Sequence, residues 1–269
     1  MKLKDQVAVV TGGARGNGLG IARTLAGEGC NIVLTDICKN IETVPYPLST
    51  RADLEEAVKE IETLGVTALG IVCDVRSAAD VKSMVDQVIS KFGKIDILVN
   101  NAGVIGLVPV VEINEATWDD VIDTHLKGTY LCCHYVVPHM IAAHYGKIIS
   151  ISSVAGQNGL GLGGHYCAAK HGIIGFSKSL AMETADHNIN INVVCPGTVW
   201  TKMMEGLAGY LGMDQESAKA QFTKRHLFKD RDLSPEDVGN AVLWLCLPES
   251  RCMTGNMITV DSGWMASVI

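Results

Sequence analysis

The chain has 269 residues, of which 48% are hydrophobic and 19% are charged, and these proportions suit one globular domain with a large buried core. A formal net charge of -7 and a pI near 5.6 argue against binding to nucleic acid or to an anionic membrane surface. No stretch of the sequence approaches the roughly 20 apolar residues that a membrane span requires.

Short runs of β-branched and aliphatic residues alternate with amphipathic helical patterns along the chain. Apolar strands that alternate with helices are typical of a parallel sheet covered on both faces, so we predict one α/β domain over residues 1–269. Ligands of such sheets bind beyond the carboxyl ends of the strands. The expected strands are Gln6–Val10, Asn31–Thr35, Ala68–Cys73, Ile95–Val99, Lys147–Ile151, Asn190–Val194 and Met257–Val260, and the expected helices include Ala78–Phe92, Glu115–Ala143, Tyr166–Ala185 and Pro235–Leu247.

A glycine-rich segment, TGGARGNGLG at 11–20, directly follows the first expected strand, and a helix is expected to continue over Ile21–Gly27. Glycine lets a backbone turn tightly and approach a pyrophosphate, whose charge then faces the positive end of the helix. The strand before this turn and the helix after it make Gly12, Gly16 and Gly18 candidate dinucleotide-binding residues.

Asp36 ends the second expected strand, twenty residues after Gly16. A carboxylate at this point can accept hydrogen bonds from the adenosine ribose hydroxyls and repels a 2′-phosphate, which predicts NAD as the cofactor. Asp36 could instead serve only as a helix cap or turn residue. Arg15 in the glycine turn could bind the same phosphate and favour NADP. We weigh Asp36 more heavily because close like charges raise the energy of a bound phosphate.

Polar residues also end the third and fourth expected strands. Asp74 closes the third, and the sequence NNAG at 100–103 closes the fourth. Small and amide residues at these positions suit a backbone that lies against adenine and ribose. The alternative is that NNAG is simply a turn, since asparagine and glycine favour turns.

Two segments interrupt the alternation of strands and helices. Residues 38–50, CKNIETVPYPLST, contain Pro45 and Pro47 and form an insertion after the second strand, and a Met-rich stretch covers residues 200–233. Long loops in a compact domain are usually functional lids or disordered segments. We expect the second stretch to form a substrate lid.

Tyr166 and Lys170 stand four residues apart in an expected helix, downstream of Ser152 and Ser153. Residues at i and i+4 share one helix face, so the Lys170 ammonium can lie near the Tyr166 hydroxyl. A unit charge roughly 4 Å away contributes on the order of 4 kcal/mol at an effective dielectric of about 20, which is about three pKa units. The pair is a candidate acid/base, although such pairs also occur on solvated helices.

These motifs together resemble the short-chain dehydrogenase/reductase family over nearly the whole chain. The resemblance implies a Rossmann-type, doubly wound parallel sheet of about seven strands with helices on both faces. It also implies a nicotinamide cofactor, a small-molecule alcohol or ketone substrate and, usually, a homotetramer built from the long fourth and fifth helices and the C-terminal strand. The matching pieces are TGGARGNG at 11–18, Asp36, NNAG at 100–103, Ser153, Tyr166, Lys170 and PGTVWT at 196–201.

Carried over to this sequence, the resemblance makes Tyr166 the acid/base. Lys170 would lower the pKa of the tyrosine and bind the nicotinamide ribose, and Ser153 would orient the substrate oxygen. Ser153 is preferred to Ser152 because it stands thirteen residues before Tyr166, the usual spacing in the family. The residues expected to contact the cofactor are Gly12, Arg15, Gly16, Asn17, Gly18, Asp36, Ile37, Asp74, Val75, Asn101, Ala102, Gly103, Tyr166, Lys170, Pro196, Gly197, Val199 and Thr201, of which the last four would hold the nicotinamide carboxamide.

One position departs from the family pattern. The family usually has an asparagine 41 residues before the tyrosine, where it supports a water in the proton relay, and His125 occupies that position here. An imidazole can both donate and accept hydrogen bonds, so the relay can continue with an added titration near about pH 6–7. The alternative is a packed or exposed histidine with no role in the relay.

The insertion resembles that of a carveol dehydrogenase-like, mycofactocin-associated subgroup, in which the segment is thought to cover NAD and slow its exchange. The sequence VPYPLST at 44–50 carries this likeness. Its prolines suit a semi-rigid cover because proline fixes φ. An ordinary surface loop is the alternative.

The implied activity is hydride transfer between a secondary alcohol carbon and nicotinamide, and a hydrophobic cyclic alcohol or ketone, such as a monoterpenoid, is the expected substrate. Two alternatives stay open. A 3-oxoacyl-carrier-protein reductase would need a basic dock, which the cations of residues 224–231 could form, whereas a non-catalytic nicotinamide-binding regulator would not need the catalytic residues. The basic residues are Lys224, Arg225, Lys229 and Arg231, and the apolar residues expected to line the substrate pocket are Val104, Ile105, Leu160, Leu162, Trp200, Met203, Met204, Tyr210 and Phe222.

The nine cysteines are scattered and form no C-x-x-C motif, which predicts reduced thiols and a cytoplasmic location. The apolar run near the N-terminus is short and ends in glycines, so it predicts a buried strand rather than a signal peptide. The sequence holds no H-E-x-x-H motif, and we expect no metal site.

Overall fold

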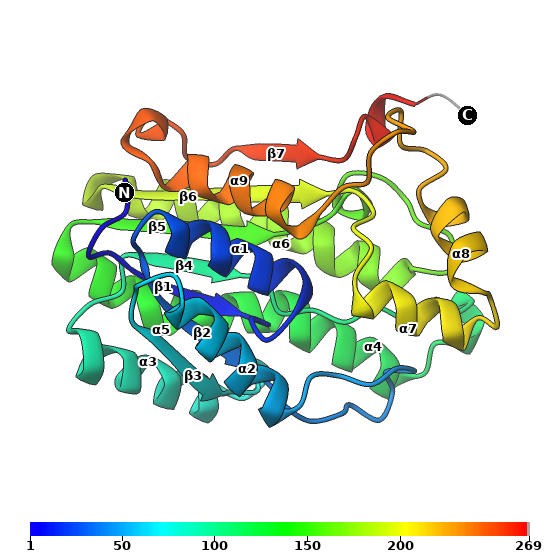
Figure 1. Ribbon diagram of the computed structural model, residues 1–269, viewed down its shortest axis with the longest axis horizontal. Helices are drawn as coiled ribbons and strands as arrows, with labels where there is room; N and C mark the ends of the chain where they lie inside the picture. The colour runs from blue at the N-terminus through cyan, green and yellow to red at the C-terminus, as the bar shows by residue number, and fades with distance from the viewer. Residues whose placement is uncertain (268–269) are drawn as a thin grey trace.

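A seven-stranded parallel sheet forms the centre of the protein (Figure 1). The computed structural model describes residues 1–267. The strands lie in the order β3-β2-β1-β4-β5-β6-β7, which confirms the predicted doubly wound α/β fold, and the strand ends differ from the expected ones by at most two residues. Their bounds are β1 Val7–Thr11, β2 Asn31–Asp36, β3 Ala68–Val72, β4 Ile97–Asn100, β5 Gly146–Ile151, β6 Ile189–Pro196 and β7 Met257–Val260.

Helices cover both faces of the sheet, and each face has its own core (Figure 1). Successive side chains of a strand point to opposite faces, so Ala8 and Val10 of β1 enter one core and Val7 and Val9 enter the other. Within residues 1–267, no helix is both long and apolar enough to cross a membrane. The first core contains residues of α1 (Gly16–Gly27), α2 (Arg51–Glu62) and α9 (Pro235–Cys246), and the second contains residues of α3 (Ala78–Phe92), α5 (Gly128–Ala143) and α6 (Gly164–Thr184).

The order of the strands reverses between β1 and β4. The chain winds outward from β1 through β2 to β3, and then from β4 through β5 and β6 to β7 on the other side. At such a reversal the loops that leave the carboxyl ends of the two central strands diverge and leave a crevice. The segments that follow Thr11 and Asn100 therefore meet at one place.

The expected helix Glu115–Ala143 is interrupted in the structure. α4 (Glu115–Ile122) passes into a π-helical turn over Asp123–Lys127 before α5 begins at Gly128. A π-helical turn holds more residues than an α-helical one and is frequent at functional sites. This turn carries His125, which is buried.

The Met-rich stretch 200–233 contains two short helices, α7 (Lys202–Tyr210) and α8 (Gln215–Phe222), which lie beyond the carboxyl ends of the strands (Figure 1). The stretch is therefore partly helical rather than an irregular loop. A local signal starts α8, because the Asp214 carboxylate accepts a hydrogen bond from the backbone N–H of Ser217 at 2.9 Å.

The insertion ends where α2 begins. The Thr50 hydroxyl accepts a hydrogen bond from the backbone N–H of Asp53 at 3.2 Å, and the Asp53 carboxylate accepts one from the backbone N–H of Thr50 at 2.6 Å. This reciprocal cap satisfies two otherwise unpaired N–H groups at the start of the helix. α2 lies outside the helices expected from the sequence, although its T-x-x-D pattern is a recognisable start signal.

Candidate active site

A large cavity of about 740 Å³ is lined by residues that follow the carboxyl ends of β1, β2, β3, β4, β5 and β6. Every residue expected from the sequence to be catalytic or to contact the cofactor lines this cavity, with the exception of Gly18. The structure thus brings together residues that are up to about 190 positions apart in the chain, as the carboxyl-end position of ligand sites in parallel sheets predicts.

The turn after β1 needs glycine at three positions, for two different reasons. Gly12 and Gly16 have φ values of +62° and +57°, a conformation that other residues rarely adopt. At Gly18 the need is steric, because a Cβ there would lie 2.1 Å from the carbonyl oxygen of Gly12. Gly18 therefore lets α1 lie against the turn instead of lining the cavity, which corrects its expected contact with a cofactor.

The turn brings the N-terminus of α1 to the cavity. Arg15 occupies the N-cap position and forms no capping hydrogen bond with its side chain, so the first backbone N–H groups of the helix are not capped by it. Among the described residues, the buried Oδ1 atom of Asn17 has no hydrogen-bond partner. Backbone N–H groups at a helix N-terminus bind phosphate groups, so the start of α1 fits the pyrophosphate of a dinucleotide.

Asp36 presents a nearly buried carboxylate at the end of β2. Its Oδ2 accepts a hydrogen bond from the backbone N–H of Ala14 at 3.2 Å, and its Oδ1 accepts one from the Ser49 hydroxyl. Arg15 donates from Nη2 to the carbonyl oxygen of Pro47 at 2.7 Å. The insertion therefore holds both charged residues that bear on the choice between NAD and NADP. Ser49 was missed at the level of sequence because no local pattern marks its contact with Asp36.

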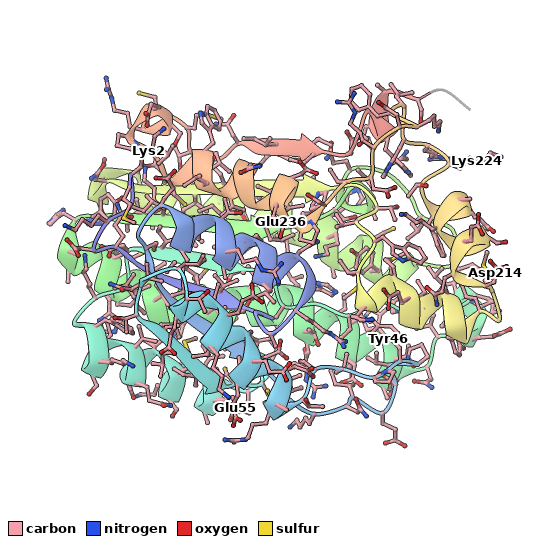
Figure 2. The ribbon with its side chains drawn as sticks, viewed as in Figure 1. Lys2, Tyr46, Glu55, Asp214, Lys224 and Glu236 are labelled. Atoms are coloured by element: carbon pink, nitrogen blue, oxygen red, sulfur yellow. The ribbon has the colours of Figure 1, made fainter. Side chains whose placement is uncertain are left out.

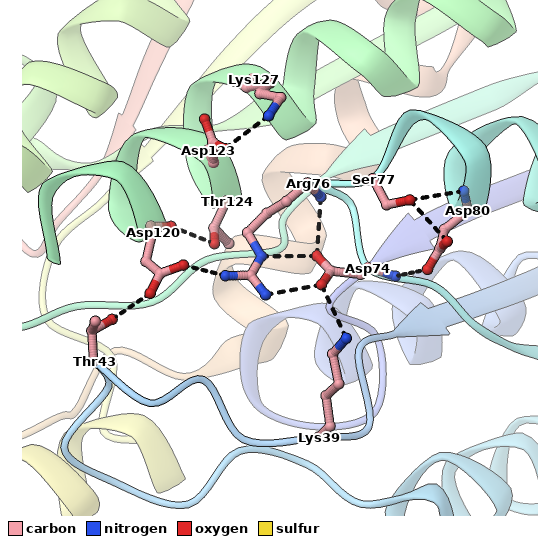
Figure 3. A network of polar contacts seen from close by, with 10 residues as sticks. All are labelled: Lys39, Thr43, Asp74, Arg76, Ser77, Asp80, Asp120, Asp123, Thr124 and Lys127. Carbon is pink, nitrogen blue, oxygen red and sulfur yellow. Dashed lines mark hydrogen bonds and ion pairs between the residues drawn. The ribbon is translucent and has the colours of Figure 1, made fainter. Parts of the chain in front are cut away.

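A charged network fixes the insertion to the loop between β3 and α3 and to α4 (Figure 3). Arg76 donates to the two carboxylate oxygens of Asp74 at 3.0 and 2.9 Å, and it also contacts Asp120. From the insertion, Lys39 Nζ lies 3.4 Å from Asp74, and the Thr43 hydroxyl donates to Asp120 at 2.7 Å. Burial raises the pKa of Asp74, but the hydrogen bonds and charge of Arg76 hold it below its usual value. Asp74 thus lines the cavity with both carboxylate oxygens already engaged.

Tyr46 joins the insertion to the loop after β4 and to α7. Its side chain is 5% exposed, and its hydroxyl accepts a hydrogen bond from the backbone N–H of Ile105 at 2.8 Å. It packs in one apolar cluster with Leu207 of α7, and a Cβ at Gly206 would lie 2.6 Å from the Tyr46 Cβ. Figure 2 shows Tyr46 beside α7. Burial raises the pKa of Tyr46, so its hydroxyl is neutral.

The first part of α6 places Tyr166 and Lys170 beside the end of β5. Lys170 Nζ lies 5.5 Å from the centroid of the Tyr166 ring and donates to the carbonyl oxygen of Ile151 at 2.7 Å. The Ser152 hydroxyl donates to the backbone carbonyl of Lys170 at 2.9 Å, which fixes α6 against β5. Ser153 is half-buried, lines the cavity together with Tyr166, and accepts a hydrogen bond at its hydroxyl from the backbone N–H of Ala155 at 3.1 Å.

Burial sets the protonation states of this pair. Burial raises the pKa of Tyr166 to about 12, and the Ser153 hydroxyl acts in the opposite direction, so the phenol is protonated. Burial also lowers the pKa of Lys170 to about 7, so its amine is only partly charged near neutral pH. The expected lowering of the tyrosine pKa by a charged Lys170 stays a prediction for the protein with its cofactor bound.

His125 lies against the catalytic candidates but does not titrate as expected. Its ring is edge-on to that of Tyr166, with centroids 5.3 Å apart, and its Nε2 lies 3.1 Å from the amide nitrogen and 2.7 Å from the carbonyl oxygen of Val104. Burial, followed by the charge of Lys170, lowers the pKa of His125 well below 6.5. The expected titration near pH 6–7 is therefore corrected. The imidazole is neutral at physiological pH because it is desolvated.

The apolar wall of the cavity agrees in part with the expectation. Leu162 is 51% exposed, Trp200 is not part of the lining, and Tyr210 lines a separate cavity of about 140 Å³, so these three assignments are corrected. Their positions depend on how two loops fold, the one before α6 for Leu162 and the stretch after β6 for Trp200 and Tyr210, which the local sequence does not specify. The confirmed lining residues are Val104, Ile105, Leu160, Met203, Met204 and Phe222, and the structure adds Gln221, Lys224, Arg225 and Trp264.

Comparisons with known proteins decide the family. The family model described as Enoyl-(Acyl carrier protein) reductase matches residues 12–265. The (-)-trans-carveol dehydrogenase of Rhodococcus erythropolis is 35% identical over 97% of this chain and 98% of that protein. This chain belongs to the short-chain dehydrogenase/reductase family. As a member, it is an oxidoreductase that acts on alcohol or ketone groups.

Other members of the short-chain dehydrogenase/reductase family are similar over the same length. The carveol dehydrogenase of Mycobacterium avium, solved in complex with NAD, has a TM-score of 0.93 and 34% identity, with 99% of each chain covered. The 3-oxoacyl-[acyl-carrier-protein] reductase FabG of Staphylococcus aureus is 36% identical over 95% of this chain and 96% of that protein. Carveol dehydrogenases and a 3-oxoacyl-[acyl-carrier-protein] reductase are therefore relatives of comparable similarity.

Proposed function

We propose that this protein is an NAD-dependent oxidoreductase that transfers a hydride between a hydrophobic secondary alcohol or ketone and nicotinamide. One observation carries the proposal, namely that Ser153, Tyr166 and Lys170 line the same cavity as the glycine turn and Asp36. When bound, the nicotinamide ring supplies the redox chemistry and, in its oxidised form, a positive charge. The cofactor contacts proposed for the chain are those predicted from the sequence, without Gly18.

Tyr166 is proposed as the acid/base and Ser153 as a hydrogen-bond donor to the substrate oxygen. For ketone reduction, the protonated phenol can donate its proton directly to that oxygen. For alcohol oxidation the phenolate is needed, so the pKa of Tyr166 must fall from about 12 toward the working pH. A protonated Lys170 would stabilise the phenolate, and its pKa of about 7 allows it to take up a proton near neutrality.

The surroundings of Asp36 support NAD rather than NADP. The carboxylate is held by Ala14 and Ser49 at a point where it would repel a 2′-phosphate. The Arg15 guanidinium, which could neutralise such a phosphate, donates instead to the carbonyl of Pro47. Two similar dehydrogenases, from Mycobacterium avium and Mycobacterium paratuberculosis, were solved with NAD bound.

A hydrophobic, cyclic alcohol or ketone such as carveol is the proposed substrate class. Ile105, Leu160 and Phe222 give the cavity an apolar wall, and Met203 and Met204 add flexible side chains that adapt to different shapes. The similarity to a (-)-trans-carveol dehydrogenase supports this choice. The second candidate, a 3-oxoacyl-carrier-protein reductase, is favoured by Lys224 and Arg225 in the cavity wall and by the staphylococcal relative.

Replacing Tyr166 by phenylalanine should reduce kcat by about 10²- to 10⁴-fold while leaving NAD binding within about twofold of the parent, because only the proton-transferring hydroxyl is removed. The measurement is the absorbance of reduced cofactor during turnover of a panel of secondary alcohols, together with calorimetric titration of NAD. A variant with near-parent kcat would refute the assignment. A parent that binds NAD but oxidises no alcohol and reduces no ketone would instead favour a non-catalytic regulator.

We also propose that the insertion covers bound NAD, as in the mycofactocin-associated subgroup that the sequence resembles. Three contacts of the insertion support this role: Ser49 with Asp36, Pro47 with Arg15, and Tyr46 with Ile105. Residues 38–49 thus bind both sides of the crevice at the carboxyl ends of the strands.

A homotetramer in the cytoplasm is the proposed physiological form. Large apolar side chains lie exposed on the helices and strand that the family uses for assembly, including Tyr130, Met182 and Met257. The nine cysteines are all free thiols, which suits a reducing compartment. Light scattering of the purified protein would establish the mass of the assembly, and a monomer at micromolar concentration would contradict the tetramer.

A further inference from the structure

Lys224 and Arg225 form a cationic group in the wall of the active-site cavity. They directly follow α8, and Figure 2 shows Lys224 at the outer edge of the molecule. Within residues 1–267, neither side chain forms an ion pair, whereas the neighbouring cations Lys202, Lys219 and Arg231 each pair with a carboxylate. The two cavity-wall cations are therefore available to a ligand, and the other three are neutralised by the protein.

The C-terminal turn positions Arg225. The backbone N–H of Leu227 donates to the carbonyl of Ser262 at 2.7 Å, which holds the segment after α8 against this turn. The guanidinium carbon of Arg225 then lies 4.5 Å from the centroid of the Trp264 ring. Contact with an aromatic face leaves the in-plane N–H donors of a guanidinium free. The carboxylate of this turn, Asp261, already accepts hydrogen bonds from two backbone N–H groups of its own loop.

The exposure of the side chains that line the cavity increases from its interior to its opening. Lys170 is buried and Tyr166 half-buried, whereas Arg225 is half-buried and Lys224 exposed. Apolar lining residues such as Phe222 belong to the same cavity. A ligand that fills it would meet a proton donor inside, apolar walls, and unpaired cations at the opening.

We propose that Arg225 and Lys224 bind an anionic group, a carboxylate or a phosphate, that the substrate carries away from its reacting carbon. This inference rests on the proposed function and holds that, among hydrophobic alcohols or ketones, those with an acidic end bind more tightly than neutral ones. A guanidinium binds carboxylate or phosphate through two parallel hydrogen bonds, and such charge-assisted bonds are stronger than neutral ones. The stacked guanidinium is already oriented, so less side-chain entropy is lost when the anion binds.

The test compares anionic substrates with neutral isosteres. The probes are 4-hydroxycyclohexaneacetic acid against its methyl ester, and 3-hydroxybutyryl-coenzyme A, which carries phosphates, against the N-acetylcysteamine thioester of the same acid, which carries none. For the parent we expect a KM about tenfold lower for one anionic probe than for its neutral partner. Arg225→Gln should raise the KM of that anionic probe about tenfold more than the KM of the neutral one. The pair that shows the effect identifies carboxylate or phosphate as the anion.

Arg231→Gln is the matched control, because Arg231 lies on the same segment, pairs with Asp230 and does not line the cavity. It should leave the ratio of the two KM values unchanged, and the KM for NAD should stay the same in both variants. Equal KM values for anionic and neutral probes in the parent, or equal losses for both in Arg225→Gln, would overturn the inference. The failure of the proposed function looks different, since the parent would then turn over neither member of either pair.

Discussion

Desolvation determines the charge of each ionisable side chain beside Tyr166. Burial raises the pKa of the phenol to about 12 and lowers that of Lys170 to about 7, and it keeps His125 neutral. Each shift disfavours the charged form, as expected for groups removed from water. The site is therefore set for proton donation by a neutral phenol, and added positive charge is needed before Tyr166 can act as a base. Lys170 is the protein group that can supply this charge by taking up a proton.

Replacing His125 by asparagine should leave the shape of the pH–rate profile unchanged between about pH 6 and 8. The pKa of the buried imidazole lies well below 6.5, so His125 is neutral over this entire range. Its titration therefore adds no change in rate between these pH values. Steady-state kcat/KM values of the parent and the variant across the range provide the measurement. A change in kcat/KM near pH 6.5 that the parent shows and the variant lacks would mean that the histidine does titrate, whatever the absolute rates are.

At the scale of elements, the insertion is an ordered loop without regular secondary structure. Its first half is held through Lys39 and Thr43, which reach the charged network of Arg76 (Figure 3). Its second half is held by Tyr46 and Ser49. Side-chain contacts with other segments of the chain thus replace the backbone hydrogen bonds that would order a helix or strand. Any opening of the insertion or of α7 must break the packing of Tyr46 between them.

Replacing Tyr46 by alanine should speed the release of bound NAD by about tenfold or more, because the loss of a large buried aromatic side chain costs about 3–5 kcal/mol of local packing. Stopped-flow displacement of NAD, followed by fluorescence, measures the rate. Tyr46→Phe is the matched control: it keeps the packing and removes only the hydrogen bond with Ile105, so its effect should be smaller. Unchanged release in Tyr46→Ala would mean that the insertion does not limit exchange of the cofactor.

At the scale of the whole molecule, the two cores contain several neutral thiols. Cys30 and Cys246 lie in the core beside α1 and α9, and Cys73, Cys132 and Cys133 lie in the core beside α3 and α5. Thiols of this kind act as small apolar groups that fill space between larger side chains. They also make the stability of the protein fall at alkaline pH, because a buried thiol ionises less readily than the same thiol in the unfolded chain.

Raising the pH above about 9 should lower the melting temperature steadily. An unfolded thiol has a pKa of about 8.5, whereas burial raises the pKa of Cys30, Cys73 and Cys133 to about 12. The unfolded state therefore loses protons that the folded state retains, and each buried thiol costs on the order of 1 kcal/mol of unfolding free energy per pH unit above about 9. Lys170, whose pKa is lowered to about 7, and Lys147, whose pKa burial also lowers, act in the opposite sense but are fewer than the buried thiols.

Calorimetry between about pH 8 and 10 tests this prediction. Cys133→Ala should show a shallower decline than the parent, and Cys252→Ala, which alters an exposed thiol, should follow the parent curve. A melting temperature that stays flat across the range in the parent would show that the buried thiols do not control alkaline stability.

Much of the architecture was accessible from the sequence because it depends on local patterns. Apolar runs of strand length predicted all seven strands, and the turn at Gly12 and Gly16 was predicted because it needs glycine. The four-residue spacing of Tyr166 and Lys170 likewise placed both in one cavity. The interruption of the helix before Gly128 was not predicted, since the residues of the π-helical turn, DTHLK at 123–127, include no proline or glycine that would mark a break.

The sequence by itself determined the strands of the parallel sheet, the glycine turn and the candidate acid/base pair, since each is encoded within a few neighbouring residues. Only the tertiary structure decided the ionisation of Tyr166 and Lys170, the hydrogen bond from Ser49 to Asp36, and the position of Arg225 in the cavity wall. These properties depend on burial and on contacts between segments far apart in the chain. Neither the loss of solvent around a group nor a partner supplied by a distant loop can be derived from local spacing.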